Sequence, residues 1–302
     1  MVEKVEQGLV IRGIGGLYSV ETAPGVRVEC RARGRLRHGG LQVMAGDHVS
    51  IVRQETGLAV IDAVLPRRNA LQRPAVANID TLVVIASAAP PVTQPFLIDK
   101  VSAIAGHKGI EMLVCINKCD IQRGDAMAEI YRKAGFEVLY TSACSGEGIA
   151  ALRARLQSGV FVLTGNSGVG KSSIINRLDP TWSAQTGAIS EKIGRGRQTT
   201  RHIELYRLPE GAYIADTPGF SSFDVERMDL VLKDDLQHAF REFAPYIPQC
   251  RYRGCTHRTE QGCAVRRALA GGEITQSRYD SYRMLFDSMK DVHAWELKKE
   301  DR

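Results

Sequence analysis

A glycine-rich segment, Gly165 to Ser172 ("GNSGVGKS"), carries the residues best suited to chemistry in this sequence. It follows the apolar run "VFVLT" and precedes the helix-like run "SSIINRL", which is the context of a phosphate-binding loop. Glycines let backbone N–H groups surround phosphates at a helix N-terminus, the lysine reaches the outer phosphates, and the serine hydroxyl binds Mg²⁺. The pattern predicts a nucleotide site made by consecutive residues: Gly165, Asn166, Ser167, Gly168, Val169, Gly170, Lys171, Ser172 and Ser173.

The segment "NKCD", at the end of the apolar run "GIEMLVCINKCD", indicates which base the nucleotide carries. The carboxylate of Asp120 can accept both N1–H and the exocyclic amine of guanine, Asn117 can contact the base edge, and Lys118 can lay its aliphatic stem along the purine. Adenine lacks that donor pair, and polar sites of this kind discriminate by about 10⁴ or more. Alone the match is weak, because Asn117 can simply cap a turn.

Two further segments follow apolar runs and fit the same nucleotide. The next predicted strand ends in "TSA", where Ser142 and the backbone of Ala143 are placed to contact the guanine O6. Later, "DTPG" follows the run "AYIA", so Asp216 can reach Mg²⁺ through water and the Gly219 N–H can meet a γ-phosphate. In isolation "DTPG" would be an ordinary turn, but its position after the phosphate loop favours a nucleotide-sensing switch.

A cysteine-rich segment near the C-terminus has the spacing of a metal site. Three thiolates and one imidazole closing a tetrahedron are typical of structural zinc, with no open position for catalysis. The four predicted ligands are Cys250, Cys255, His257 and Cys263. The alternative is three buried free thiols beside an unrelated histidine. Arg251 and Arg253 flank the ligands and predict a basic, RNA-contacting surface.

Bulk composition describes a globular protein. The chain has 302 residues, 44% hydrophobic and 25% charged, and a length of this order predicts about two domains. The N-terminus lacks a secretory signal pattern, and the apolar stretch 81–98 is interrupted by prolines, so neither export nor a membrane span is expected. Scattered cysteines favour reduced thiols and a cytoplasmic location. The net charge of +6 weakly favours an anionic partner.

Residues 8–70 read as short strands separated by Gly, Pro and Asp turn signals, a pattern that predicts a small barrel of the oligonucleotide-binding (OB) type. Its second strand is expected over 26–37, where arginines at every other position would share one strand face. A solvated basic edge that discourages strand pairing is the alternative, but the planar guanidinium suits phosphate and favours RNA. The four arginines are Arg31, Arg33, Arg35 and Arg37.

From residue 79 the pattern changes to near-continuous apolar runs alternating with helical stretches. Such runs predict parallel strands buried on both faces, hence a doubly wound α/β domain. The strands are expected at 79–87, 111–120, 136–143, 160–168, 202–208 and 211–219. After about residue 224 no such strand is expected, and a helix is predicted over 276–300.

The order of the motifs is base loop, O6 loop, phosphate loop, then the switches, with the base-reading half placed first. In this the chain resembles a circularly permuted GTPase of the RsgA/YjeQ family. The resemblance covers nearly the whole chain, with an OB-type barrel, a circularly permuted α/β P-loop GTPase domain and a mainly helical zinc-binding domain. The domains are expected at residues 1–70, 71–224 and 225–302.

The resemblance also implies a catalytic region in "GRGRQTTRH", residues 194–202. Relatives typically carry a histidine followed by threonines there, with the histidine proposed to position water. Gln198 occupies the histidine position, and Phe220 follows the "DTPG" glycine where ordinary GTPases place a glutamine. Gln198 is therefore predicted to orient the attacking water, while Lys171 contacts the phosphates and Thr199 or Thr200 binds Mg²⁺. The alternative is that Gln198 is only a polar loop residue.

The function implied by the resemblance is GTP hydrolysis during late maturation of the small (30S) ribosomal subunit. The protein is expected to bind the subunit through its rRNA, and the subunit is expected to stimulate the GTPase activity. The expected cofactors are one structural Zn²⁺ and Mg²⁺ with GTP, and a monomer is expected. The alternative is an RNA-binding regulatory module whose GTP/GDP pocket acts as a sensor with negligible turnover. An ATP-dependent enzyme is disfavoured by Asp120.

Overall fold

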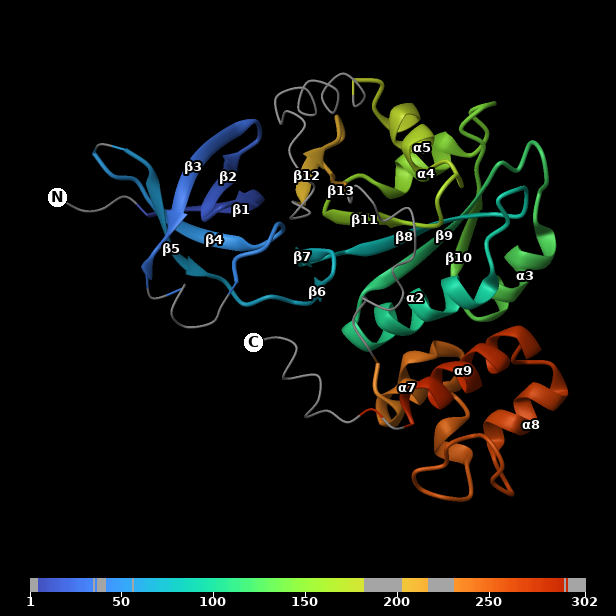
Figure 1. Cartoon of the computed structure of the whole chain (residues 1–302). Coiled ribbons are helices and arrows are strands. Elements are labelled where there is room, and N and C mark those ends of the chain that lie inside the picture. The colour runs from blue at the N-terminus through green and yellow to red at the C-terminus, as the bar shows by residue number, and fades with distance from the viewer. Residues whose placement is uncertain are drawn as a thin grey trace. The chain divides into compact units, whose positions relative to one another are not determined.

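The computed structural model describes residues 5–34, 36, 42–55, 57–181, 203–216, 231–290 and 292 (Figure 1). It divides into two compact units, each formed from separate stretches of the chain. The first holds residues 1–81, 149–163 and 172–220, and the second holds residues 82–148, 164–171 and 221–302. The bounds of the three domains expected from the sequence stay a prediction.

Five strands near the N-terminus close into a barrel in the first unit. They are β1 (Val5–Ile14), β2 (Leu17–Ala23), β3 (Val26–Ala32), β4 (His48–Val52) and β5 (Ala59–Val64). β1 pairs with both β2 and β4, and β2 pairs with β3. β5 closes the barrel, because it pairs in parallel with β3 and antiparallel with β4. Val10, Val20, Ile51 and Ile61 fill the interior with no exposed surface. The predicted barrel is confirmed.

The first of the short strands expected in residues 8–70 is a hairpin of β1 and β2. Gly15 and Gly16 have φ angles of 58° and 82°, a left-handed pair that only glycine adopts readily. Two such residues favour the tight turn whose twist matches antiparallel strands. The "GG" pair was the turn signal in the sequence.

The prediction of four arginines on one strand face is wrong. β3 ends at Ala32, and Gly34 and Leu36 already have helical backbone. The N–H of Leu36 donates to the Arg33 carbonyl at 3.0 Å, and the Leu36 side chain packs against the barrel core. Burial of this leucine therefore turns the chain out of the sheet, so positions 31 and 33 do not continue as a strand face.

Three more strands of the first unit continue from the barrel: β11 (Val160–Thr164), β12 (Glu204–Arg207) and β13 (Tyr213–Asp216). β11 and β13 are parallel, as expected for a doubly wound sheet. β12 departs from the all-parallel prediction, because it runs antiparallel to β13 and also pairs with β1 of the barrel at Arg12 and Glu204. The helix α4 (Ile149–Arg155) and the short hairpin of β6 (Ala70–Gln72) and β7 (Ala75–Ala77) complete this part.

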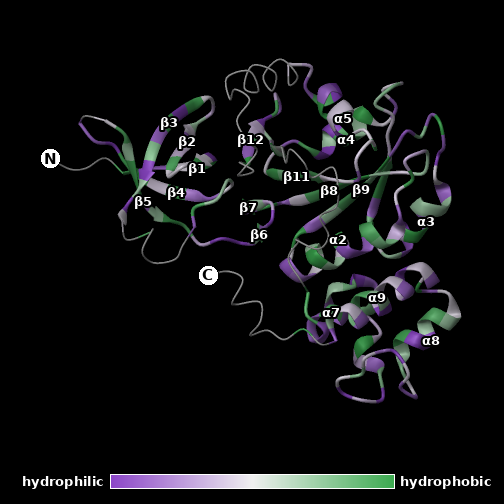
Figure 2. Cartoon of the chain, in the orientation of Figure 1, coloured by the Kyte–Doolittle hydropathy of each residue, from purple (hydrophilic) through white to green (hydrophobic). Residues whose placement is uncertain are grey.

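The second unit contains the strands that precede the predicted base loops. They lie in the order β10 (Glu137–Tyr140), β9 (Glu111–Asn117) and β8 (Thr81–Ser87), with β9 and β10 parallel. β8 and β9 are almost entirely buried, and Figure 2 shows β9 and β11 as largely hydrophobic runs. The helices α2 (Pro95–Lys108) and α3 (Asp125–Lys133) connect these strands, and α5 (Lys171–Leu178) follows the glycine-rich loop.

Residues 231–290 contain helices and no strand, as predicted. They form α7 (Lys233–Ala239), the short helices η1 (Arg241–Phe243) and η2 (Ile247–Gln249), α8 (Ala264–Gly271) and α9 (Gln276–Met289). The predicted helix over 276–300 ends at Met289, and residues 293–302 lie outside the described part. α7 approaches α2 closely, since a Cβ on Gly106 would lie 2.5 Å from the Ala239 carbonyl oxygen.

A buried arginine joins α9 to α2 and η1. The Arg278 side chain has no exposed surface, and its guanidinium donates to Asp99 at 2.9 Å, Ser102 at 2.6 Å and both oxygens of Glu242. A buried cation is tolerated only when its charge and donors are paired, as they are here. None of the helices within the described residues has the length and apolarity to cross a membrane.

Candidate functional site

The glycine-rich loop between β11 and α5 has the shape of a phosphate-binding turn. Gly165 has a φ of 149°, and a Cβ there would lie 2.1 Å from the Ile85 carbonyl oxygen. Gly170 has a φ of 98°, and a Cβ there would lie 2.4 Å from Nδ2 of Asn117. Both positions therefore exclude any side chain, which is why glycine stands at each. Val169 between them is fully buried and anchors the loop.

Lys171 points its charge into this loop. Its Nζ donates to the carbonyl oxygens of Gly165 at 2.6 Å and Asn166 at 2.9 Å, and burial lowers its pKa. A desolvated ammonium held among backbone groups attracts an anion strongly. Ser172 and Ser173 follow in the first turn of α5 with exposed side chains, and such a hydroxyl fits Mg²⁺ that accompanies a nucleotide.

Asn117 ties three loops together. It is 1% exposed, and its Nδ2 donates to the Val169 carbonyl at 2.7 Å. Its Oδ1 accepts from the Ala143 N–H at 3.2 Å and the Thr141 hydroxyl at 3.4 Å. The side chain thus joins the phosphate loop to the "TSA" loop, a tether that its position in the sequence did not reveal. A contact from Asn117 to the base edge stays a prediction.

The other predicted base-side residues surround this tether. Lys118 has a φ of 61°, uncommon for a residue with a side chain, and its Nζ donates to the Pro90 carbonyl at 2.8 Å. Asp120 is exposed two residues later and available to a ligand. Ser142 is fully buried, and its hydroxyl accepts from the Ser145 N–H at 3.0 Å, which shapes the loop. The structure brings these segments together within the second unit.

The predicted switch residues are not placed by the structure. Asp216 ends β13, but its side chain lies outside the description, as do all atoms of four others. Those four are Gln198, Thr199, Thr200 and Gly219. Their assignments to water, Mg²⁺ and phosphate stay predictions.

The predicted RNA-contacting arginines have separate surroundings. Arg31 is exposed at the end of β3, whereas Arg33 is bonded to Asp62 of the barrel. Arg35 and Arg37 lie outside the described residues. Beside the cysteine cluster, Arg251, Tyr252 and Arg253 all have exposed side chains. The guanidinium carbon of Arg251 lies 5.4 Å from the centroid of the Tyr252 ring. Their roles toward RNA stay predictions.

The four predicted metal ligands converge on one point. Their donor atoms, from Cys250, Cys255, His257 and Cys263, all lie within 4.8 Å of one another. Nδ1 of His257 is 3.6 Å from one sulfur and 3.4 Å from another. A tetrahedral zinc site separates its donors by about 3.6 Å, given Zn–S and Zn–N bonds of about 2.3 and 2.1 Å. The donor set and its spacing fit such an ion.

Surrounding groups orient these ligands. The other ring nitrogen of His257 lies 2.9 Å from Oε1 of Gln237, which leaves Nδ1 free to bind a metal. The N–H groups of Ala264 and Arg266 at the start of α8 donate to the sulfurs of Cys250 and Cys263 at 3.3 and 3.5 Å. Negative charge on sulfur is thus favoured at a helix N-terminus.

The ligand loop is held from outside by three further residues. The hydroxyl of Tyr279 donates to the His257 carbonyl at 2.7 Å, and that of Tyr282 donates to the Thr256 carbonyl at 2.8 Å. Burial would raise the pKa of Glu260, but hydrogen bonds from Thr256 and the backbone lower it to about 2. Sequence reasoning missed these supports, because nothing in their spacing marks them as partners of the loop.

Burial favours the neutral forms of Cys255 and His257. It raises the pKa of the Cys255 thiol to about 12 and lowers the pKa of His257. A divalent metal would therefore displace thiol protons on binding, and the free energy of binding becomes free energy of folding for the segment around it. The cluster can hold a metal ion in a structural role.

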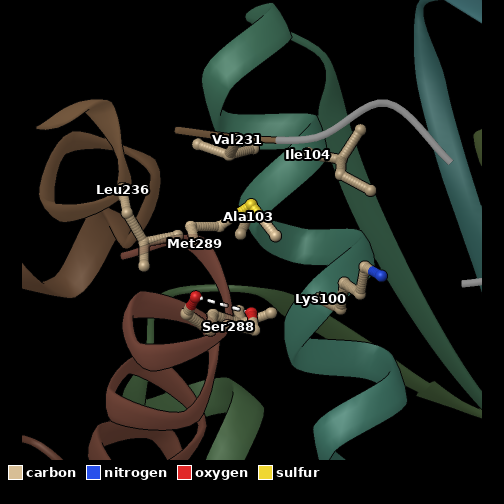
Figure 3. A pocket seen from close by; sticks show the side chains of 8 residues that line it. Lys100, Ala103, Ile104, Val231, Leu236, Ser288 and Met289 are labelled. Atoms are coloured by element: carbon tan, nitrogen blue, oxygen red, sulfur yellow. Dashed lines mark hydrogen bonds between the residues drawn. The ribbon is translucent and has the colours of Figure 1, made fainter. Parts of the chain in front are cut away.

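A small pocket lies apart from both sets of residues. It is formed by α2, α7 and α9 and is lined mainly by apolar side chains, with Lys100 at its edge (Figure 3). The Ser288 hydroxyl, which faces it, is already bonded to the Leu285 carbonyl at 2.8 Å. Without a free polar group to orient a ligand, the pocket is a packing gap between helices.

The amino-acid sequence matches two family models. One, described as RsgA GTPase, matches residues 64–226, and the other, described as RsgA N-terminal domain, matches residues 7–61. A protein of Ruminiclostridium cellulolyticum named small ribosomal subunit biogenesis GTPase RsgA is 39% identical over 98% of this chain and 97% of its own length. One of that name from Agathobacter rectalis is 40% identical over 94% of this chain and 98% of its own.

Solved structures are similar along the same length. The crystal structure of YjeQ from Thermotoga maritima has a TM-score of 0.80 and 31% identity, covering 96% of this chain and 100% of its own. The structure of YloQ, described as a circularly permuted GTPase, has a TM-score of 0.78 and 30% identity, covering 96% of each chain. The motif order found here is thus found in a protein of known structure.

Proposed function

Because the chain belongs to the RsgA GTPase family, we propose that it hydrolyses GTP to GDP and phosphate while acting in the assembly of the small ribosomal subunit. Family membership confirms the predicted resemblance, the fold class and the GTPase activity. The finer part of the proposal is that the protein binds the 30S subunit through rRNA late in its maturation and that the subunit stimulates hydrolysis.

The observation that carries the proposal is the Asn117 tether. One buried amide holds the phosphate loop at Val169 and the "TSA" loop at Ala143, so the loops on either side of a nucleotide form one assembly. Asp120 is exposed beside it to accept from guanine. A carboxylate suited to guanine and a phosphate loop tethered to the same assembly favour GTP over a bare phosphate ligand.

Each residue near the phosphates has a distinct proposed task. Lys171 turns its ammonium from the loop carbonyls to the outer phosphate oxygens and neutralises the charge that grows as phosphate departs. Ser172, with Thr199 or Thr200, would hold Mg²⁺, which would supply positive charge against the phosphate oxygens. Gln198 accepts from the attacking water and orients it, Asp216 supports the metal through water, and Gly219 donates to the γ-phosphate.

The cysteine cluster holds one structural Zn²⁺ in this proposal. Its donor spacing fits tetrahedral zinc, and closed ligation leaves no position for a reacting group. The exposed Arg251 and Arg253 beside it, with Arg31 on the barrel, offer guanidinium groups to rRNA phosphates. Such binding weakens steeply with salt, because each phosphate contact releases counterions. We place this activity in the cytoplasm, as a monomer.

Phosphate release from GTP, with and without purified small subunits, tests the proposal. We expect strong stimulation by the subunit, no stimulation by isolated large subunits, and no turnover of ATP. Tight GTP binding without turnover in either condition would instead support a regulatory sensor. Asp120→Asn should weaken GTP and admit xanthosine triphosphate, because the amide reverses one hydrogen bond to the base.

A further inference from the structure

The segment Ser87–Thr93, here called the proline loop, connects β8 to α2 and is closed by its own hydrogen bonds. The N–H of Thr93 donates to the Ser87 carbonyl at 2.8 Å, and the N–H of Ser87 donates to Oγ1 of Thr93 at 3.0 Å. The Ser87 hydroxyl donates to the Ala89 carbonyl at 2.7 Å. All three side chains are fully buried. A loop stapled by buried bonds in this way keeps one shape.

The exposed tip of the proline loop faces both nucleotide-binding segments. The carbonyl of Pro90 accepts from Nζ of Lys118 at 2.8 Å. The ring of Pro91 stands over the phosphate loop, since a Cβ built on Gly168 would lie 3.1 Å from its Cγ. The tip therefore contacts the base loop at Lys118 and the phosphate loop at Gly168, from a segment that sequence reasoning did not assign to the site.

A third contact fixes the far end of the base loop. A Cβ built on Gly124, where that loop enters α3, would lie 2.9 Å from Cβ of Ala88. Gly124 has a φ of 79°, so the close approach and the backbone both require glycine. The proline loop thus lies against the base loop near its beginning and at its end.

Lys118 is strained, and the proline loop supplies the partner that holds it. A left-handed backbone at a non-glycine residue costs of the order of one to three kcal/mol and persists only where its surroundings enforce it. Here the side chain of the preceding residue, Asn117, is buried and hydrogen-bonded to Val169 and Ala143, and the ammonium at the other end is held by Pro90. With both ends held, the aliphatic stem of Lys118 has little freedom.

We propose that the proline loop is a positioning element for the guanine nucleotide: by holding the ammonium of Lys118 at Pro90, it keeps the lysine stem in place as a wall for the purine. This rests on the proposed function, because it assumes that a guanine nucleotide occupies these loops. The contacts reach the base loop and the phosphate loop, which hold the guanine and the phosphates that GDP and GTP share. GDP and GTP should therefore depend on the loop equally, and the hydrolysis step should not.

The matched pair Thr93→Val and Thr93→Ser tests the staple in the full-length protein. Valine has the shape of threonine but leaves the buried Ser87 N–H without its acceptor, whereas serine keeps the hydroxyl. We expect Thr93→Val to weaken the affinity for fluorescent GDP and for a slowly hydrolysed GTP analogue alike by about 5- to 10-fold, the effect of one hydrogen bond. Thr93→Ser should restore most of the affinity, and the single-turnover hydrolysis rate of bound GTP should not change.

A double-mutant cycle with Lys118→Met separates positioning from general loosening. Methionine keeps an apolar stem but cannot bond Pro90, so Thr93→Val should cause no further loss of affinity in the Lys118→Met background. Ser288→Ala serves as the control, because it removes a hydroxyl bonded within α9 at 2.8 Å, away from the loop. It should leave nucleotide affinity unchanged.

Three results would overturn the proposal: unchanged affinities in Thr93→Val, full additivity with Lys118→Met, or an equal loss in Ser288→Ala. A loss for GTP alone would also contradict it, because it would place the loop in the hydrolytic step. Failure of the wild-type protein to bind any guanine nucleotide is a different outcome. It would remove the proposed function itself, and this inference with it.

Discussion

The nucleotide loops and the cysteine cluster lie in the same compact unit but are built in opposite ways. The loops are shaped by backbone, with glycines at close approaches and a tether, Asn117 to Val169, between residues 52 positions apart. The cluster takes its donors from side chains of one short segment, in which burial favours the neutral forms of Cys255 and His257. A site made by distant loops depends on the sheet that holds them, whereas a site made by one segment depends on its ligand.

Metal removal should have the largest effect and should act on one region only. Structural zinc contributes about 10–16 kcal/mol of apparent binding energy, so Cys255→Ser should lose the metal and unfold residues around 250–263. Metal content by atomic spectroscopy and limited proteolysis of that region measure the result. Cys144→Ser, at an exposed cysteine, is the control. Retention of metal and protease resistance by Cys255→Ser would show that packing alone holds the cluster.

The buried network of Arg278 should give the second-largest effect, because it joins α9, which follows the cysteine cluster, to α2. Arg278→Met leaves Asp99 and Glu242 buried without their cation, which costs about 3–5 kcal/mol of unfolding free energy. Denaturant unfolding measures it, with Arg283→Met on the exposed side of α9 as the control. Adding Asp99→Asn and Glu242→Gln to Arg278→Met should recover part of the loss; no recovery would argue against charge as its cause.

A methyl group in the phosphate loop should act on the nucleotide site alone. Gly170→Ala forces a Cβ to 2.4 Å from Nδ2 of Asn117, and overpacking of this kind costs about 1–3 kcal/mol, enough to lower GDP affinity by about 10- to 100-fold. Gly109→Ala separates the clash from the backbone strain, because Gly109 is also left-handed, with a φ of 64°, but has open space around its Cβ position. It should lower the melting temperature slightly and leave GDP affinity intact. Equal affinities in the two variants would contradict the tether.

The smallest effect is expected at the surface between the two base-side loops. Arg123 and Glu147 form an ion pair at 3.4 Å, with side chains 55% and 49% exposed. Exposed pairs contribute about 0–1 kcal/mol, so Glu147→Gln should change GDP affinity by no more than about fivefold, and the change should vanish in 1 M salt. A larger or salt-independent loss would mean that Glu147 acts by another route than its charge.

Local spacing was enough to predict several parts of both regions. The glycines at 165 and 170, the lysine after them and the four metal donors follow rules that need only neighbours in sequence, and the structure has both glycines at close approaches and the four donors within 4.8 Å of one another. The buried strands were equally readable, because a strand covered on both faces must be apolar along its length. Their roles toward GTP, metal and RNA remain predictions.

Non-local choices could not be predicted in the same way. The arginine alternation after residue 30 favoured a longer β3, but the burial of Leu36 against the barrel core ends the strand at Ala32. β12 was expected to run parallel with the other strands, yet it runs antiparallel to β13 and also pairs with β1. In each case packing against a distant segment decided the outcome, since local propensity is worth less than burial.

By itself, then, the sequence determined the kinds of site this protein has, their order along the chain and the family they resemble, because residue type and spacing within one segment carry that chemistry. Tertiary structure alone decided which residues hold the sites in place: Asn117 as the tether, the proline loop as the partner of Lys118, and Arg278 as a buried cation. Each depends on groups that meet only after folding. An amide, a carbonyl or a guanidinium has no fixed partner until folding brings donors and acceptors of distant segments within hydrogen-bonding reach.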